Sequence, residues 1–394
     1  MGKIGIAVIG ISGVGRSHLQ AAKDTPGFEL RAVCDVNAQA AEACGKELGV
    51  AAYTDHKAMF KADPQIKAVS IATPHWFHPP IAIDAAKAGV HVLSEKPIAV
   101  TVSDADRMIA AHKKAKTTLA VVYQQRFRPA LAKARELVAS GALGRVNRTL
   151  LVAADYRTNA YYASAGWRAT WKGEGGGVLL NQAPHDLDLF QWICGAMPRE
   201  IYAKTETKMH PIEVEDCANA LLWYANGAIG YLYASTCEIP RDQRIEIAGD
   251  KGKLILEGDK LRFARLKEDL RHFTATTDKK WSQPEAAWEE VALGEPGVQG
   301  HTRVFHDFHR ALDTNSPPAV TGEDARNSLE LANAMILSSR TGKPVKLPVN
   351  RGAYDALMKK LIATSIGRGQ TTAKSKPKPK PKAKPKKKSK AKRK

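Results

Sequence analysis

The fold of the first part of this protein is decided near its N-terminus, by the stretch Ile4-Gly5-Ile6-Ala7-Val8-Ile9-Gly10-Ile11-Ser12-Gly13-Val14-Gly15. The apolar run 4–9 is bounded by glycines and predicts a buried parallel strand, and a helical pattern follows the turn. The first glycine of such a turn permits a tight bend, the last permits close helix–strand packing, and the helix N-terminus offers N–H groups to a phosphate. The stretch therefore predicts a cradle for a dinucleotide pyrophosphate, formed by Gly10, Ser12, Gly13, Val14 and Gly15.

Two residues refine the prediction of a dinucleotide cradle: Ser12 concerns the binding of phosphate, and Asp35 concerns which dinucleotide is bound. Ser12 stands where the middle glycine of GxGxxG would fall; its hydroxyl can donate to phosphate, and the alternative is an ordinary strand–helix turn. Asp35 follows the predicted strand 30–34, where a carboxylate reaches a ribose 2′-OH. A 2′-phosphate would meet like charge there, so the sequence favours NAD over NADP. The alternative is that Asp35 is a turn residue ahead of Asn37.

Strand and helix patterns alternate along the first 125 residues. Further strands are predicted at 68–72, 91–94 and 119–123, and helices at 38–48, 79–88 and 103–116. This alternation predicts an α/β unit over residues 1–125, an NAD-binding Rossmann domain with a doubly wound parallel sheet.

After a predicted helix at 129–140 and the turn Gly141–Gly144, the pattern changes from alternating strands and helices to mainly strands. Strands are predicted at 146–154, 200–208, 216–224, 228–238, 243–248 and 253–257, and helices at 183–194, 302–314 and 322–341. Residues 126–350 are therefore predicted to form an α+β domain with a large, mostly antiparallel open sheet.

Composition and charge narrow the class of protein. Of the 394 residues 44% are hydrophobic and 25% are charged, as in a soluble globular protein, and the sequence has no apolar run long enough for a membrane span. We find no secretory signal, and the five cysteines are odd in number and form no CxxC pair, so a cytoplasmic location is expected. No Cys or His spacing typical of a metal site is present, so no metal is predicted.

The C-terminal segment differs from the rest of the chain. Residues 370–394 hold 12 Lys, one Arg and no acidic residue, which leaves about +7 of the net charge of +20 for the remainder. The Lys/Pro/Ala-rich tail 367–394 is predicted to be disordered. Through 374–394 it could contact nucleic acid or another polyanion without reading sequence; the alternative is a solubilising tail without a defined partner.

Two polar clusters follow predicted strands, at the edge where a dinucleotide would lie. The first is Thr73-Pro74 with His75 and His78, and the second is Glu95-Lys96-Pro97. Thr73, Pro74, His78, Glu95 and Lys96 are therefore expected to bind the cofactor. A lysine at the end of a buried strand is costly unless its charge is used. In a dehydrogenase it can donate to the substrate hydroxyl and stabilise the alkoxide that develops as hydride leaves. The alternative is that Lys96 forms a surface ion pair.

Roughly residues 3–349 resemble the glucose–fructose oxidoreductase / inositol dehydrogenase (Gfo/Idh/MocA) family. The segments that carry the resemblance are Ala7–Gly15 with His18, Asp35, Ala72-Thr73-Pro74 with His78, Glu95-Lys96-Pro97, Gln125-Arg126-Phe127, Ser140–Gly144, Gly175-Gly176-Gly177 through Asn181 to His185 and Asp188, and Val320–Ala325 to Pro344-Val345. The resemblance implies that Lys96 binds the substrate hydroxyl and positions the nicotinamide, and that His185 is the general acid–base, an imidazole titrating near neutral pH. It also implies that the domain 126–350 binds substrate and builds a homodimer or homotetramer. The alternative for His185 is a packing or helix-capping role.

The sequence departs from the family at Asn181, where many members carry Asp. An amide can hydrogen-bond substrate or imidazole, but it does not stabilise an imidazolium as a carboxylate does. Leu180-Asn181-Gln182 together with Gly166-Trp167-Arg168 resembles members that act on nucleotide-linked or uronate sugars, with Arg168 or Arg157 as anion partner. Tyr156, Tyr161 and Tyr162 could line a sugar pocket or belong to the core or to an interface. The candidate substrate-binding residues are Arg126, Tyr156, Trp167, Arg168, Asn181 and His185.

The sequence as a whole predicts an NAD-dependent oxidoreductase that transfers hydride between nicotinamide and a sugar, an inositol or a nucleotide- or uronate-type sugar derivative. The residues predicted to act on the reacting hydroxyl are Lys96, His185 and Asn181. Two alternatives stay open. The first is a catalytically weak NAD-binding scaffold or sensor, tethered to nucleic acid by the basic tail. The second is an enzyme that holds its cofactor tightly and recycles it between two sugars.

Overall fold

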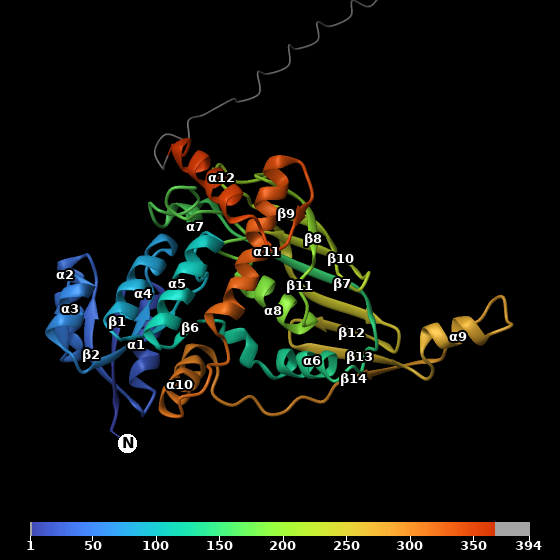
Figure 1. The fold of residues 1–394 in the computed structure, drawn as a ribbon, viewed down its shortest axis with the longest axis horizontal. Coiled ribbons are helices and arrows are strands. Elements are labelled where there is room, and N and C mark those ends of the chain that lie inside the picture. The colour runs from blue at the N-terminus through green and yellow to red at the C-terminus, as the bar shows by residue number, and fades with distance from the viewer. Residues whose placement is uncertain (1, 367–394) are drawn as a thin grey trace, which may run out of the picture.

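The computed structural model describes residues 2–366, and the predicted disordered tail at 367–394 lies outside this range. Two sheets dominate the described chain, one in the N-terminal part and one in the C-terminal part (Figure 1). Among the helices of residues 2–366, none is both long and apolar enough to cross a membrane.

The first sheet has six parallel strands in the order β3-β2-β1-β4-β5-β6. The strands are β1 Ile4–Ile9, β2 Phe28–Cys34, β3 Ala51–Tyr53, β4 Ile66–Ile71, β5 His91–Ser94 and β6 Leu119–Val121. The helices between them are α1 Val14–Lys23, α2 Ala38–Leu48, α3 His56–Ala62, α4 His78–Lys87 and α5 Val102–Ala115. The predicted Rossmann fold is confirmed. The sequence analysis missed β3 and α3, because a three-residue strand with two exposed residues has no apolar run.

The second sheet has nine strands in the order β14-β13-β12-β11-β7-β10-β9-β8-β15. They are β7 Val146–Tyr156, β8 Glu200–Glu206, β9 Cys217–Trp223, β10 Ile229–Ser235, β11 Cys237–Gly249, β12 Gly252–Glu257, β13 Lys260–Leu266, β14 Ala286–Glu290 and β15 Val345–Lys346. β7 and β10 pair in parallel, and the other paired strands are antiparallel, as predicted. The predicted strand 228–238 is divided at Thr236, where β10 ends and β11 begins.

The helices of the C-terminal part are α6 Pro129–Ala139, α7 Asn159–Ala163, α8 Pro184–Cys194, α9 Leu270–Thr276, α10 Gly300–Asp313, α11 Gly322–Thr341 and α12 Arg351–Ala363. Helices α8 and α11 pack on one face of the nine-stranded sheet (Figure 1). Helix α10 returns to the N-terminal part and packs on α1, where Phe28, Phe305 and Phe308 form a buried aromatic cluster.

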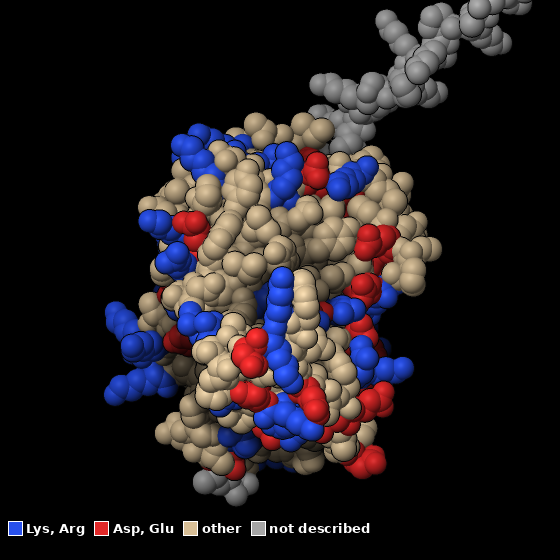
Figure 2. All heavy atoms as spheres, turned by 90° about the vertical axis from the view of Figure 1, so that its right-hand side faces the viewer, with Lys and Arg blue, Asp and Glu red and all other residues tan. Residues whose placement is uncertain are grey.

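The other face of the nine-stranded sheet carries exposed apolar side chains. Tyr202, Leu221 and Tyr231 occupy directly opposite positions on β8, β9 and β10, and each is 39–43% exposed. Figure 2 looks at the molecule from this side and shows a broad area with few charged side chains in its upper half. The fold therefore covers one face of the nine-stranded sheet with α8 and α11 and leaves the apolar face open.

Candidate active site

A cavity of about 700 Å³ lies between the two parts of the chain. Its lining includes many of the predicted site residues: Gly10, Ser12, Gly13, Val14, Asp35, Thr73, Pro74, Glu95, Lys96, Trp167, Arg168 and Asn181. Five other predicted residues lie outside this lining, namely Gly15, His78, Arg126, Tyr156 and His185. The carboxyl ends of the parallel strands and the loop before α8 thus meet around one space.

The glycine loop leaves no room for side chains at its two ends. Gly10 has φ +83°, and a Cβ there would lie 2.8 Å from the carbonyl carbon of Ala72. A Cβ at Gly15 would lie 2.0 Å from the carbonyl oxygen of Gly10. Gly13, with φ +54°, faces open space. This close backbone approach at the N-terminus of α1 is the geometry that a dinucleotide pyrophosphate requires.

Asp35 connects the end of β2 to the glycine loop. Its Oδ2 accepts the N–H of Ile11 at 3.1 Å, and its Oδ1 accepts the N–H of Asn37 at 3.0 Å. The carboxylate therefore serves as a turn residue and also lines the cavity beside the loop. Its position fits recognition of a ribose hydroxyl, and the residues present fit NAD.

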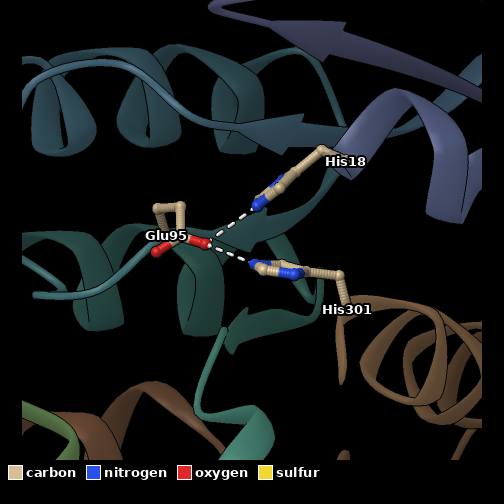
Figure 3. A group of neighbouring side chains, drawn as sticks. All are labelled: His18, Glu95 and His301. Carbon is tan, nitrogen blue, oxygen red and sulfur yellow. Dashed lines mark hydrogen bonds and ion pairs between the residues drawn. The ribbon is translucent and has the colours of Figure 1, made fainter. Parts of the chain in front are cut away.

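Glu95 is the centre of a buried hydrogen-bonded group (Figure 3). Its Oε1 accepts from Nε2 of His18 at 2.9 Å and from Nε2 of His301 at 3.3 Å, and His18 Nδ1 lies 2.6 Å from the Ser70 hydroxyl. Burial alone would raise the pKa of Glu95, but the hydrogen bonds from both histidines hold that pKa well below its usual range. This carboxylate joins α1, the end of β5 and α10, and no local sequence signal indicates that His301 takes part.

Within residues 2–366, two side-chain groups have the ligand atoms of a metal site, although no metal was predicted. His18, Glu95 and His301 form the first, and the second consists of His210, Asp216 and Cys237, each with its ligand atoms within 4.8 Å of one another. Each group is held together by hydrogen bonds between its own members. In the first group His18 bonds to Glu95, and in the second His210 Nδ1 lies 2.9 Å from Asp216 Oδ2. The sequence spacing could not reveal either group, because tertiary contacts assemble them.

Lys96 follows β5 and lines the cavity. Its Nζ donates to the backbone carbonyl of Asn181 at 2.8 Å, which ties the end of β5 to the loop before α8. Burial lowers the pKa of Lys96, and the nearby Arg168 and Arg157 lower it further, whereas Glu95 and Glu174 oppose the shift. A lysine in this setting can donate a proton more readily than one in water.

His78 was predicted to bind the cofactor, but it lies fully buried behind the cavity wall. Its Nδ1 lies 2.9 Å from the carbonyl oxygen of Pro97, and its Nε2 lies 2.7 Å from that of Thr73. The ring therefore holds the two polar clusters together, and its location makes it a support for the loops that line the cavity.

His185 begins the first turn of α8 and packs with its ring 5.6 Å from that of Tyr123. Its Nδ1 is buried and has no hydrogen-bond partner among the described residues. Burial, followed by the charge of Lys96, lowers the pKa of His185 to about 3. The sequence analysis expected a group that titrates near neutrality; in the structure, burial and Lys96 together outweigh the opposing charge of Glu95 and favour the neutral imidazole.

Asn181 is linked to a buried carboxylate that the sequence analysis did not single out. Its Nδ2 donates to Oε1 of Glu174, which is 1% exposed, and the same nitrogen lies 3.4 Å from the hydroxyl of Tyr161. Burial raises the pKa of Glu174 to about 7, despite the hydrogen bonds from Ala169 and Asn181. The available signal was an acidic residue placed directly before the glycine run 175–177.

Arg168 lies on two aromatic rings at the cavity. Its guanidinium carbon is 4.7 Å from the ring centre of Tyr161 and 4.6 Å from that of Trp167, and its Nη1 donates to the Tyr161 hydroxyl at 2.9 Å. Its Nε is buried without a hydrogen-bond partner among the described residues. Arg157 approaches the same Tyr161 ring at 5.2 Å. The cavity wall therefore carries positive charge on an aromatic base.

The remaining predicted substrate residues have other surroundings. Arg126 is buried and forms a bidentate ion pair with Asp188 at 2.7 and 2.6 Å, so its guanidinium is already occupied. Tyr162 is buried in the core, with its hydroxyl 2.7 Å from that of Thr236, as the core alternative predicted. Tyr156 ends β7 and is 42% exposed. None of these three lines the cavity.

Comparison with known proteins agrees with this geometry. Residues 4–123 match a family model described as an oxidoreductase family with an NAD-binding Rossmann fold, and residues 131–255 match that of the GFO/IDH/MocA C-terminal domain. The chain is 27% identical to myo-inositol 2-dehydrogenase of Thermotoga maritima over 348 residues, which cover 87% of this chain and 98% of that protein. It is 29% identical to D-apiose dehydrogenase of Paraburkholderia graminis over 353 residues, which cover 86% and 89%.

A solved structure extends the likeness to three dimensions. The WlbA dehydrogenase from Bordetella pertussis, crystallised with NADH and UDP-GlcNAcA, is 28% identical, with a TM-score of 0.74 over 88% of this chain and 100% of that one. The sheets, the glycine loop and these likenesses agree, so the chain belongs to the Gfo/Idh/MocA family of NAD-binding oxidoreductases.

Proposed function

We propose that this enzyme transfers hydride between NAD and a hydroxyl-bearing carbon of a sugar, an inositol or an acidic or nucleotide-linked sugar. The observation that carries the proposal is the position of Lys96, which lines the same cavity as the glycine loop and Asp35. A cation at one end and a dinucleotide cradle at the other fit a substrate hydroxyl held beside nicotinamide.

Each step of the proposed mechanism is assigned to a side chain. Bound NAD supplies the ring to and from which hydride moves. Lys96 donates a hydrogen bond to the reacting oxygen and stabilises its negative charge as the C–H bond breaks. We assign acceptance of the hydroxyl proton to His185, which lies near Lys96 outside the cavity lining and whose burial favours the neutral imidazole, the form that can accept a proton. In the reverse direction His185 returns this proton to the carbonyl oxygen while Lys96 holds that oxygen by its hydrogen bond.

We propose further that the substrate carries an anionic group that Arg168 binds. Supporting this, the guanidinium is held by Tyr161 and Trp167 at the cavity and keeps a buried Nε without a partner among the described residues. A guanidinium recognises carboxylate and phosphate through paired N–H donors. The relative crystallised with UDP-GlcNAcA, a ligand with both groups, is consistent with this class.

The test is a substrate screen on the purified full-length protein. Inositols, neutral sugars, uronates and UDP-sugars are mixed with NAD, and formation of NADH is followed by absorbance. We expect turnover of at least one acidic sugar, with Lys96→Ala and His185→Ala inactive and the exposed Lys87→Ala, the matched control, fully active. Normal NAD binding without turnover of any of these compounds would contradict the proposed activity, and turnover of neutral sugars alone would contradict the role of Arg168.

We also propose that the apolar sheet face is covered by a second copy of the chain, in a homodimer or homotetramer. The row Tyr202, Leu221 and Tyr231 is large and exposed, which is the property of an interface rather than of a free surface. Light scattering after gel filtration should show an oligomer that Leu221→Glu converts to monomers. Trp281→Glu, which changes an apolar residue 90% exposed elsewhere, should leave the oligomer intact; a monomeric wild type would refute the proposal.

A further inference from the structure

We propose that Glu174 is a positioning residue for this reaction: its carboxylate fixes the side-chain amide of Asn181 so that the amide oxygen faces the cavity and accepts a hydrogen bond from a substrate hydroxyl. The inference rests on the proposed function, because it concerns the same site. Glu174 itself lies behind the cavity lining, so it acts through Asn181 and not by touching substrate.

The hydrogen bonds around Glu174 determine which way the amide points. An ionised carboxylate has only acceptor atoms, so it selects the Nδ2 of Asn181 as its neighbour. The other carboxylate oxygen accepts the N–H of Ala169 at 2.5 Å. Tyr161 lies 3.4 Å from the same Nδ2, on the same side of the amide. With its nitrogen directed at both groups, Asn181 has Oδ1 left for a ligand in the cavity that it lines.

The same residue couples Glu174 to Lys96. The backbone oxygen of Asn181 accepts from Lys96 Nζ at 2.8 Å, and its side chain donates to Glu174. The negative charges of Glu174 and Glu95 both favour the charged form of Lys96 against its burial. One hydrogen-bonded residue therefore separates the carboxylate from the lysine that is proposed to hold the reacting oxygen, and loss of the carboxylate would affect both groups.

The protonation of Glu174 provides a switch for this arrangement. Burial raises the pKa of Glu174 to about 7. The ring of His75 contacts the backbone carbonyl of Glu174. The other ionisable groups around the carboxylate are Arg168, whose Nη1 lies 3.8 Å away, Lys96, Glu215, Tyr161 and Tyr162. A protonated carboxyl can donate its O–H to Oδ1 of Asn181, which lets the amide turn and present N–H to the cavity. Substrate binding should therefore weaken as pH falls through about 7.

The first experiment observes the amide directly and needs no substrate. The side-chain amide signals of Asn181 are recorded by ¹⁵N NMR on the full-length protein and identified by their absence in Asn181→Asp. We expect a pH-dependent shift with a midpoint near 7, which disappears in Glu174→Gln. A signal that does not respond between pH 5 and 9, or that responds identically in Glu174→Gln, would overturn the proposal even if no substrate has been found.

The second experiment is a double-mutant cycle in steady-state kinetics. Asn181→Asp places a second carboxylate against Glu174, and like charges in a buried site destabilise each other, so kcat/KM should fall about a hundredfold. Glu174→Gln alone should lower kcat/KM about tenfold, mainly through KM, and should remove the activity change near pH 7. The double variant should recover about tenfold over Asn181→Asp alone, because the neutral Gln relieves the repulsion.

Two controls separate a positioning role from a folding role. The NAD dissociation constant of Glu174→Gln should stay within about twofold of the wild type, because Asp35 and the glycine loop are untouched, and Glu174→Asp should be intermediate in KM. Additive losses in the cycle, or an equal loss of NAD binding and thermal stability in Glu174→Gln, would assign Glu174 a structural role. Absence of turnover in the wild type would instead count against the proposed function.

Discussion

The two ends of the cavity are built in different ways. The dinucleotide end is made by backbone, since Gly10 and Gly15 allow chain segments to approach within distances that no Cβ tolerates, and Asp35 caps the loop from the next strand. The other end is made by side chains from distant segments, where Asn181 is hydrogen-bonded to both Lys96 and Glu174. A backbone site depends on local conformation, whereas a side-chain site depends on how whole elements pack, and substitutions should separate the two.

The largest effect is expected at Lys96. Lys96→Ala removes the cation that stabilises the developing alkoxide, so kcat/KM should fall about 10³-fold or more. The NAD dissociation constant should change by less than about threefold, because the adenosine end does not involve this residue. Stopped-flow hydride transfer and equilibrium NAD titration on the same protein measure both quantities. A comparable loss of NAD binding would show that the two ends are not independent.

At the other end, two glycines form a matched pair. Gly15→Ala places a Cβ 2.0 Å from the oxygen of Gly10, so we expect a loss of about 3 kcal/mol in the free energy of unfolding, together with loss of NAD binding. A Cβ at Gly13 would meet no atom within 4 Å. Gly13→Ala should therefore lower the free energy of unfolding by only about 1 kcal/mol, the strain of an alanine at φ +54°. Urea denaturation gives both values. Since alanine ordinarily stabilises a helix relative to glycine, an unchanged Gly15→Ala would refute the crowding.

The buried carboxylate predicts a pH dependence of stability. The folded pKa of Glu174 is raised from 4.5 to about 7, so its protonated form stabilises the fold at low pH and that stability is lost as pH rises through 7. The wild type should therefore lose about 3 kcal/mol relative to Glu174→Gln between pH 4 and pH 8. The difference between two denaturation series cancels the other titrating groups. A flat difference would mean that Glu174 is ionised throughout.

The smallest effect is expected at Asp35. Asp35→Ala removes a carboxylate proposed to bind the ribose hydroxyls, so NAD should bind about tenfold more weakly, and the preference for NAD over NADP should shrink. Fluorescence titration with both dinucleotides measures the ratio, with the exposed Glu42→Ala as control. If Asp35→Ala leaves the ratio unchanged, the residue acts as a turn former alone, through its bond to Asn37.

The quality of the sequence-based predictions follows the same division. Helices α2 and α11 were predicted with their observed bounds, because each has a clear amphipathic or capped pattern; α2 is capped by Asn37, and α11 begins with a capping box at Thr321. Strands β13, β14 and β15 were missed, since β15 has two residues and the residues of β14 are exposed. The neutral state of His185 could not be predicted, because desolvation by the packed protein sets its pKa.

By itself the sequence determined the Rossmann sheet, the open antiparallel sheet, the dinucleotide cradle and the family, because strand periodicity, glycine conformation and short motifs act over a few residues. The tertiary structure alone decided that His301 joins Glu95, that Arg126 is taken by Asp188, and that Glu174 stands behind Asn181. Those outcomes depend on burial and on contacts between distant segments. The free energies of these contacts come from desolvation and from paired charges, and both arise only when folding brings the distant segments together.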